Sequence, residues 1–317
     1  MQFRTQIPIL KSNHQIDYNS KIVSLGSCFA VNMGDKLDYF KFSNTINPFG
    51  ILFHPLALEK FIHYALSQKQ FTEADIFYNN ERWHCFDAHS DLSSPDKEIL
   101  LNNLNTAITT THTQLKQASH LVITLGTAWV YTYLESGSMV ANCHKVPQKQ
   151  FSKGLLSIDS IKESLHNLID SIAAFNHGIH IIFTVSPVRH IKDGFTENLW
   201  SKSNLISALQ DVLLNKLESN CSYFPSYEIM MDELRDYRFY AEDMIPPNSI
   251  AIDYIWERFT DVWITTDATA TMKEADSIQK ALQHRSFNPN SQQHRDFIAK
   301  LNTRIVQLQE KYPHIIF

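Results

Sequence analysis

The sequence lacks the motifs that would place it in several large classes of protein. Its four cysteines are scattered over 317 residues without CxxC spacing, which argues against a disulfide scaffold and against a zinc ribbon. HExxH, GxGxxG and GxxxxGK[ST] motifs are absent, so we expect neither a metal nor a nucleotide cofactor. The 28 Lys and Arg residues form no basic block and are outnumbered by 33 Asp and Glu, so we expect no nucleic-acid partner.

Long apolar runs are also absent. No stretch approaches the ~20 apolar residues that span a bilayer, and the N-terminus lacks the charged and apolar regions of a signal peptide. We therefore expect no membrane association, and the scattered cysteines favour a cytoplasmic location. The 44% apolar content is nevertheless sufficient to bury a large core.

Short strand patterns alternate with longer helical patterns along the chain. Residues 21–25, 121–125 and 180–185 are apolar and β-branched, and each run ends at Gly or at Ser-Pro. Apolar stripes at helical spacing lie between them: Leu58, Phe61, Ile62, Ala65 and Leu66, then Ile161, Leu165, Leu168 and Ile172. This alternation predicts a three-layer α/β/α sandwich with a central parallel sheet, whose ligands bind beyond the carboxyl ends of the strands.

Two segments depart from the alternation. Residues 129–147 alternate apolar and polar side chains around Glu135-Ser136-Gly137, which predicts an inserted β-hairpin. From Asn248 onward the pattern is helical throughout. Because no linker composition occurs anywhere, we predict one domain over residues 1–317, with a core of about 20–260 and a helical extension over 261–317.

Ser27 is the most informative single residue. It follows a buried strand and Gly26 and precedes a helical pattern, so its hydroxyl should lie at the carboxyl edge of the sheet beside helix N–H groups. That is a suitable position for a nucleophile. The local pattern is equally that of a serine that only caps the helix, while Cys28 beside it is typical of a buried core thiol.

Six ordered sequence blocks add a resemblance to a known family. Residues 26–30 read GSCFA, and they are followed by the blocks NPFGI at 47–51, LGTAWVY at 125–131, NCHKVP at 142–147, SPVRH at 186–190 and DYRFYAEDM at 236–244. This series resembles the GSCFA family, within the SGNH hydrolase superfamily of serine esterases and lipases. The resemblance implies a flavodoxin-like sandwich with a Ser-His-Asp arrangement on loops at one edge.

The resemblance also implies roles for individual residues. Ser27 corresponds to the nucleophile, and the N–H groups of Ser27 and Gly50 to the oxyanion donors. Asn47, Thr127 and His144 lie in family-like blocks and complete the expected oxyanion and binding residues.

The chain departs from the superfamily pattern at two positions. Ala128 occupies the place of an oxyanion-hole asparagine, and Pro246 occupies the histidine position of the Asp-x-x-His block that begins at Asp243. A serine without an imidazole is a weak nucleophile. We therefore consider three other histidines: His190, which we favour as the catalytic base oriented by Asp243, and His144 and His54 as alternatives.

Two functions follow as expectations. The first is hydrolysis of a carboxylic ester through an acyl-serine intermediate, on an O-acyl group of a saccharide or of another small polar molecule; an acyl transferase would use the same intermediate. The alternative is a catalytically impaired relative that keeps the cleft as a ligand-binding module, which Pro246 and Ala128 favour.

Overall fold

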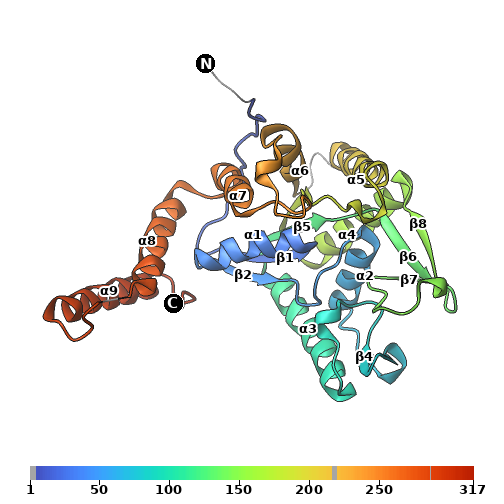
Figure 1. The fold of residues 1–317 in the computed structure, drawn as a ribbon, viewed down its shortest axis with the longest axis horizontal. Helices are drawn as coiled ribbons and strands as arrows, with labels where there is room; N and C mark the ends of the chain where they lie inside the picture. Colours follow the sequence, from blue (N-terminus) through green and yellow to red (C-terminus); the bar gives the residue numbers. More distant parts are fainter. Residues whose placement is uncertain (1–4, 216–219, 286) are drawn as a thin grey trace.

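Five parallel strands form the centre of the molecule, in the order β10-β9-β5-β1-β2 (Figure 1). The computed structural model describes residues 5–215, 220–285 and 287–317. The strands of this sheet are β1 (Lys21–Gly26), β2 (Ser43–Ile46), β5 (His120–Leu125), β9 (His180–Val185) and β10 (Cys221–Phe224). Every residue of β5 and β9 is buried, as expected of central parallel strands, so the three predicted strand runs are confirmed.

The strand order creates a point of divergence between β1 and β5. From β1 the chain passes outward to β2, and it then returns to β5 on the other side of β1 to continue toward β9 and β10. The loops that follow β1 and β5 therefore lead away from each other at the carboxyl edge. Such a switch point is where open α/β sheets bind ligands.

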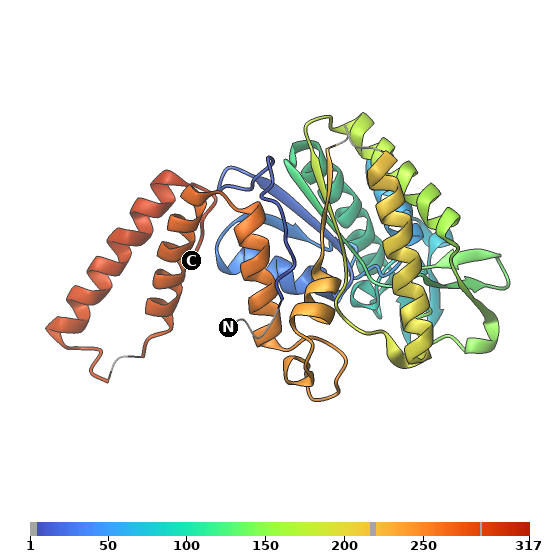
Figure 2. The same ribbon diagram turned by 90° about the horizontal axis from the view of Figure 1, so that it is seen from above.

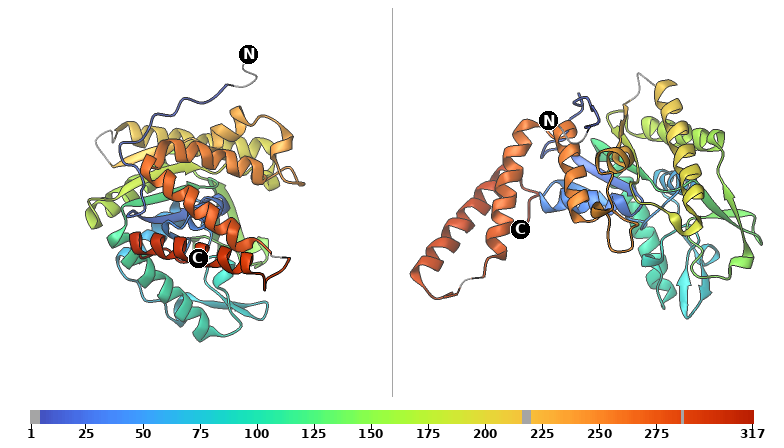
Figure 3. Two further views of the ribbon diagram at one scale, coloured as in Figure 1. Left: turned by 90° about the vertical axis from the view of Figure 1, so that its left-hand side faces the viewer. Right: turned by 45° about the horizontal axis from the view of Figure 1, so that its top comes forward.

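Helices cover both faces of the sheet (Figures 2 and 3). One face is covered by α2 (Pro55–Leu66), α3 (Lys97–Gln117), α4 (Ile158–Phe175) and α5 (Phe195–Asn215), and the other chiefly by α1 (Cys28–Tyr39) and α7 (Ser249–Trp263). Alternate residues of β1 point to opposite faces of the sheet. Val23 and Leu25 pack in the core under α2–α5, whereas Ile22 packs in the core under α1 and α7. The three-layer α/β arrangement follows from this pattern.

Two small antiparallel sheets are added to the core. The expected hairpin consists of β6 (Trp129–Tyr133) and β7 (Ser138–Val140), and β8 (Phe151–Leu155) pairs with the other side of β6. A second hairpin, β3 (Phe77–Asn79) and β4 (Arg82–His84), was not predicted, because its three-residue strands are too short for a clear alternation.

The C-terminal region is helical, as expected. After the short α6 (Ser226–Glu228), α7 packs on the sheet through Ile255 and Phe259. Helices α8 (Thr266–Gln283) and α9 (Gln292–Lys311) pack against each other and project from one end of the molecule (Figure 2). Among the described helices, none is both long and apolar enough to span a membrane.

We expect Gly26→Ala to lower the free energy of unfolding by about 3 kcal/mol. Gly26 has a φ of 132°, and a Cβ at this position would lie 2.1 Å from the carbonyl oxygen of Thr124 in β5. Gly154→Ala is the matched control, because a Cβ there has no heavy atom within 4 Å. Denaturant unfolding of the two variants measures the difference, and equal stabilities would show that β1 and β5 can separate at little cost.

Candidate functional site

The loops at the carboxyl edge of the sheet carry most of the residues that the sequence singled out. Ser27 directly follows β1, Asn47 and Gly50 follow β2, Thr127 follows β5, and His190 lies in the segment after β9. These segments are far apart along the chain, and the parallel sheet gathers their starting points at one edge.

Ser27 is the N-cap of α1 and is fully buried. Its Oγ accepts a hydrogen bond from the backbone N–H of Phe29 at 3.3 Å, and its own N–H donates to the carbonyl of Thr124 at 3.1 Å. Gly126 packs over it, since a Cβ at position 126 would lie 3.2 Å from the Cβ of Ser27. The serine therefore serves as a helix cap in this structure, and its backbone donor is used by β5.

The loop after β2 is held by its own hydrogen bonds. The Oδ1 of Asn47 accepts the N–H of Gly26 at 2.8 Å, and the carbonyl of Asn47 accepts the N–H of Gly50 at 2.8 Å. Gly50 has a φ of 75°, and a Cβ there would lie 2.2 Å from the Cβ of His89, so only glycine fits. Like that of Ser27, the N–H of Gly50 is thus engaged by a backbone carbonyl.

One side-chain donor in this loop is unused. The Nδ2 of Asn47 is buried and has no hydrogen-bond partner within the described part of the chain. Since the Oδ1 of the same amide is fixed by Gly26, this NH₂ group is held at the carboxyl end of β1. This NH₂ group could donate a hydrogen bond to an oxyanion or to a ligand carbonyl.

Thr127 ties the end of β5 to α5. Its Oγ1 lies 3.0 Å from the Oγ of Ser201, and it also accepts the N–H of Trp129 at 3.1 Å. The N–H of Ala128 donates to the same Ser201 Oγ at 2.7 Å. A serine hydroxyl from α5 therefore occupies the hydrogen-bonding position beside Ala128.

His190 carries a neutral imidazole that lacks a partner. Its ring packs edge-on against Phe53 with a centroid separation of 5.8 Å, and its Nε2 is buried without a hydrogen bond to any described residue. Burial, aided by the charge of Lys202, lowers the pKa of His190 to about 3. This imidazole is therefore unprotonated at neutral pH.

The other two candidate histidines are bound to the backbone. The Nδ1 of His54 accepts the N–H of Ala57 at 3.1 Å as the N-cap of α2, so its Nε2–H donates to the carbonyl of Val140 at 3.2 Å. His144 contacts the carbonyl of Cys85 through Nε2 at 2.7 Å. Burial lowers the pKa of each imidazole to about 4. Within the described chain, no hydrogen bond joins Ser27 to a histidine.

Asp243 is exposed and forms a local turn. Its carboxylate accepts the N–H of Ile245 at 3.1 Å, and the carbonyl of Pro246 accepts the N–H of Ala241 at 2.9 Å. The turn is fastened to the segment after β9 by Arg189, whose backbone N–H donates to the carbonyl of Ile245. Position 246 therefore lies near the strand end that carries His190.

A cavity of about 480 Å³ opens beside these loops. It is lined by residues from five separate segments, including Phe53, Thr127, Trp129, Cys143, His190 and Ile245. The carbonyl of Phe53 accepts the N–H groups of Gly126 and Thr127, which places Phe53 next to the Ser27 layer. Ser27 itself does not line the cavity. We refer to this space as the edge cavity.

Lys202 is a further functional candidate in this region. Its side chain is 1% exposed, and its Nζ donates to the carbonyls of Gly126 at 2.7 Å and Ser186 at 2.8 Å, at the ends of β5 and β9. Burial lowers its pKa to about 7. A signal for this burial exists in the sequence, because Lys202 shares a helical stripe with Leu205 and Leu209.

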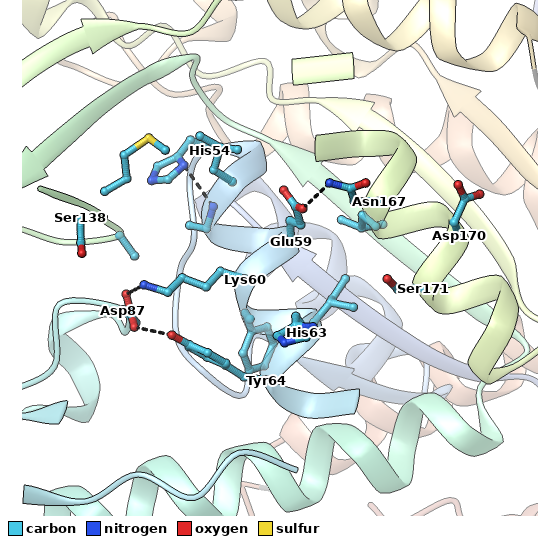
Figure 4. A pocket seen from close by; sticks show the side chains of 17 residues that line it. His54, Glu59, Lys60, His63, Tyr64, Asp87, Ser138, Asn167, Asp170 and Ser171 are labelled. Carbon is cyan, nitrogen blue, oxygen red and sulfur yellow. Dashed lines mark hydrogen bonds and ion pairs between the residues drawn. The ribbon is translucent and has the colours of Figure 1, made fainter. Parts of the chain in front are cut away.

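A second cavity lies between α2, α4 and the β6–β7 hairpin (Figure 4). In its wall, Lys60 and Tyr64 both donate to the carboxylate of Asp87, at 2.6 and 3.0 Å. Glu59 accepts a hydrogen bond from Asn167 at 2.9 Å. No group of three potential metal-ligating side chains occurs in this cavity or elsewhere among the residues that the structure describes.

These features define an α/β protein with a ligand-sized cavity at the carboxyl edge of a parallel sheet. Residues 21–259 match the GSCFA family, and residues 275–317 match the GSCFA domain protein, C-terminal domain. The chain therefore belongs to the GSCFA family. No curated protein sequence matches it significantly.

We expect His54→Asn to reduce the acid sensitivity of the fold. The folded pKa of about 4 lies below the ordinary 6.5, so the unfolded chain binds the proton more tightly and stability falls as the pH drops from about 6.5 toward 4. Asparagine retains the helix cap but does not titrate. Between pH 7 and 5 the variant should lose roughly 1 to 2 kcal/mol less of its free energy of unfolding than the wild type.

The control for this experiment is His63→Asn, which removes an exposed imidazole from the same helix. Denaturant unfolding at several pH values gives the slope for all three proteins. A His54→Asn slope equal to that of the wild type would mean that His54 gains a proton without cost in the folded state.

Proposed function

We propose that this protein binds a small polar molecule in the edge cavity and that ester hydrolysis at Ser27 is at most slow. The observation that carries the proposal is that both expected oxyanion donors are already in use: the N–H groups of Ser27 and Gly50 donate to backbone carbonyls. An oxyanion hole needs donors that are free and aimed at the developing charge. Pro246, in place of a histidine, supports the same conclusion.

The cavity itself supports binding. It lies at the carboxyl edge of the sheet, and its volume of about 480 Å³ is in the range of small-molecule sites. Trp129 and Tyr131 supply aromatic surface, while Asn142 and His190 supply polar groups. A few polar groups in a mostly apolar wall are typical of a site that orients one ligand.

Hydrolysis of a carboxylic ester is the second candidate function, and one observation favours it. Ser27 stands at the N-terminus of α1, separated by Gly126 from a lysine whose pKa is near neutrality. In an SGNH-like reaction the Ser27 Oγ would attack the ester carbonyl, the alcohol would leave, and water would release the acid from the acyl-serine. The substrate would be an O-acyl saccharide or another small polar ester, and an acyl acceptor in place of water would make the protein a transferase.

Roles for the remaining residues follow in this second candidate. Either His190 or the neutral amine of Lys202 would accept the proton of Ser27, with Asp243 orienting the imidazole if His190 moves toward it. Asn47 Nδ2 would be the oxyanion donor that the structure leaves free.

The four cysteines are free thiols, which agrees with the reducing cytoplasm that we propose as the location.

Blocking the edge cavity should abolish ligand binding. Cys143 is half-buried in the cavity wall, so Cys143→Trp should fill the space with an indole ring. Met139→Trp is the matched control, because Met139 lines only the second cavity. Ligand-observed NMR with a fragment library should give hits that Cys143→Trp loses and Met139→Trp keeps. Hits that persist in Cys143→Trp would place binding elsewhere.

Replacing Pro246 by histidine tests the hydrolase candidate. If only the imidazole is missing, Pro246→His should raise p-nitrophenyl acetate hydrolysis by a factor on the order of 100, the scale of a positioned general base. Ser27→Ala in the same background should return the rate to that of buffer. The wild type should react slowly with a fluorophosphonate probe, and Ser27→Ala should not react.

The outcomes separate the two candidates. A folded Pro246→His variant that is no faster than the wild type, combined with labelling that is unaffected by Ser27→Ala, would remove hydrolysis at Ser27 and leave binding as the function.

A further inference from the structure

The edge cavity carries an excess of positive charge. Arg189 and Lys192 line it, and Asp193 is the only Asp or Glu in its wall. That carboxylate is already paired with Lys153. Lys192 has no ion-pair partner among the described residues, although it lies close enough to Cys143 to oppose the burial-driven rise of the thiol pKa.

The side chain of Arg189 is held in place, but it does not use all of its hydrogen-bond donors within the described part of the chain. Its guanidinium donates to the carbonyl of Met244 and lies 4.3 Å from the centroid of the Tyr240 ring. The Nε of Arg189 is nevertheless buried without a hydrogen bond to any residue that the structure describes, and the same is true of His190 Nε2. Buried polar atoms without partners are costly, and two adjacent residues that line one cavity share this condition.

Part of the remaining wall is apolar and aromatic. Trp129 and Tyr131 are half-buried, and Val140 and Ile245 lie in the same wall. The ammonium of Lys153, which is paired with Asp193, lies 4.7 Å from the centroid of the Trp129 ring. Such a wall accommodates a flat or alkyl group next to the cationic one.

We infer that the edge cavity binds a small organic anion, with a carboxylate or phosphate group at Arg189 and Lys192 and an apolar body against Trp129. This inference rests on the proposed binding function and names the class of its ligand. Guanidinium groups suit both carboxylate and phosphate, because two of their N–H groups can donate side by side.

The second cavity does not share this character. There the only lysine, Lys60, is neutralised by Asp87, and the wall also contains Glu59 and Asp170 (Figure 4). An anion placed in it would face more carboxylates than cations. An anionic ligand is therefore expected in the edge cavity and not in the second cavity.

Three probes of similar shape test the inference: benzoate, phenyl phosphate and benzamide, titrated at constant ionic strength and followed by NMR. At least one anion should bind the wild type about tenfold or more tightly than neutral benzamide, the scale of one charge-assisted hydrogen bond. Comparing the two anions shows whether carboxylate or phosphate is preferred.

Charge variants assign the effect to residues. Lys192→Gln and Arg189→Gln should each reduce anion affinity by about three- to tenfold or more while leaving benzamide unchanged. Arg189→Lys should retain part of the affinity, because it keeps the charge but loses the planar group. Lys149→Gln is the control, since it removes an equal charge from an exposed residue outside the cavity wall.

Each other outcome has a definite meaning. Benzamide binding as tightly as the anions would overturn the inference and leave the proposed binding function intact. Anion binding that survives Cys143→Trp, or that the two Gln variants do not weaken, would also overturn it. If none of the probes binds at about 10 mM and the fragment library gives no hits, both the inference and the binding function fail.

Discussion

The close contact between the ends of β1 and β5 controls the geometry of the candidate site. Gly26 approaches the carbonyl of Thr124 so closely that no side chain fits between them. The chain then turns into α1, and the same carbonyl accepts the N–H of Ser27. Because of this contact, the serine is both fixed at the carboxyl edge and deprived of its free backbone donor.

Lys202 is the second constraint on this region. Lysine is rarely fully buried, and burial without a carboxylate partner favours the neutral amine. Two N–H groups of this amine donate to the carbonyls of Gly126 and Ser186, and burial lowers its pKa to about 7. The lysine thus joins the ends of β5 and β9, and it lies close enough to His190 for its charge to lower the pKa of that imidazole.

The structure separates two features that a serine hydrolase would combine. Ser27 is buried under Gly126 and next to Phe53, whereas Arg189 and His190, each with an unpartnered polar atom, line the edge cavity. A hydrolase requires the ligand and the nucleophile to meet, which here requires a movement that exposes Ser27, because this residue is fully buried and does not line the cavity. Binding in the edge cavity requires no such movement, and this difference in cost is the physical reason to place binding first.

The amino-acid sequence by itself determined the main elements of the fold. The runs that became β1, β5 and β9 are apolar over five or six residues, and the stripes of α2, α4 and α7 have helical spacing, so local periodicity was sufficient to predict them. The GSCFA blocks likewise indicated the family, because all six occur in the expected order along the chain. The strands β3 and β4 escaped prediction because three residues do not establish a period.

The tertiary structure alone decided the state of the site. The N–H of Ser27 is engaged by the carbonyl of Thr124, and the Nε2–H of His54 is engaged by the carbonyl of Val140. The helical stripe hinted that Lys202 is buried, but its carbonyl partners lie 16 and 76 residues away along the chain. Such pairings are made by strand order and loop packing, and a sequence pattern read locally carries no information about them.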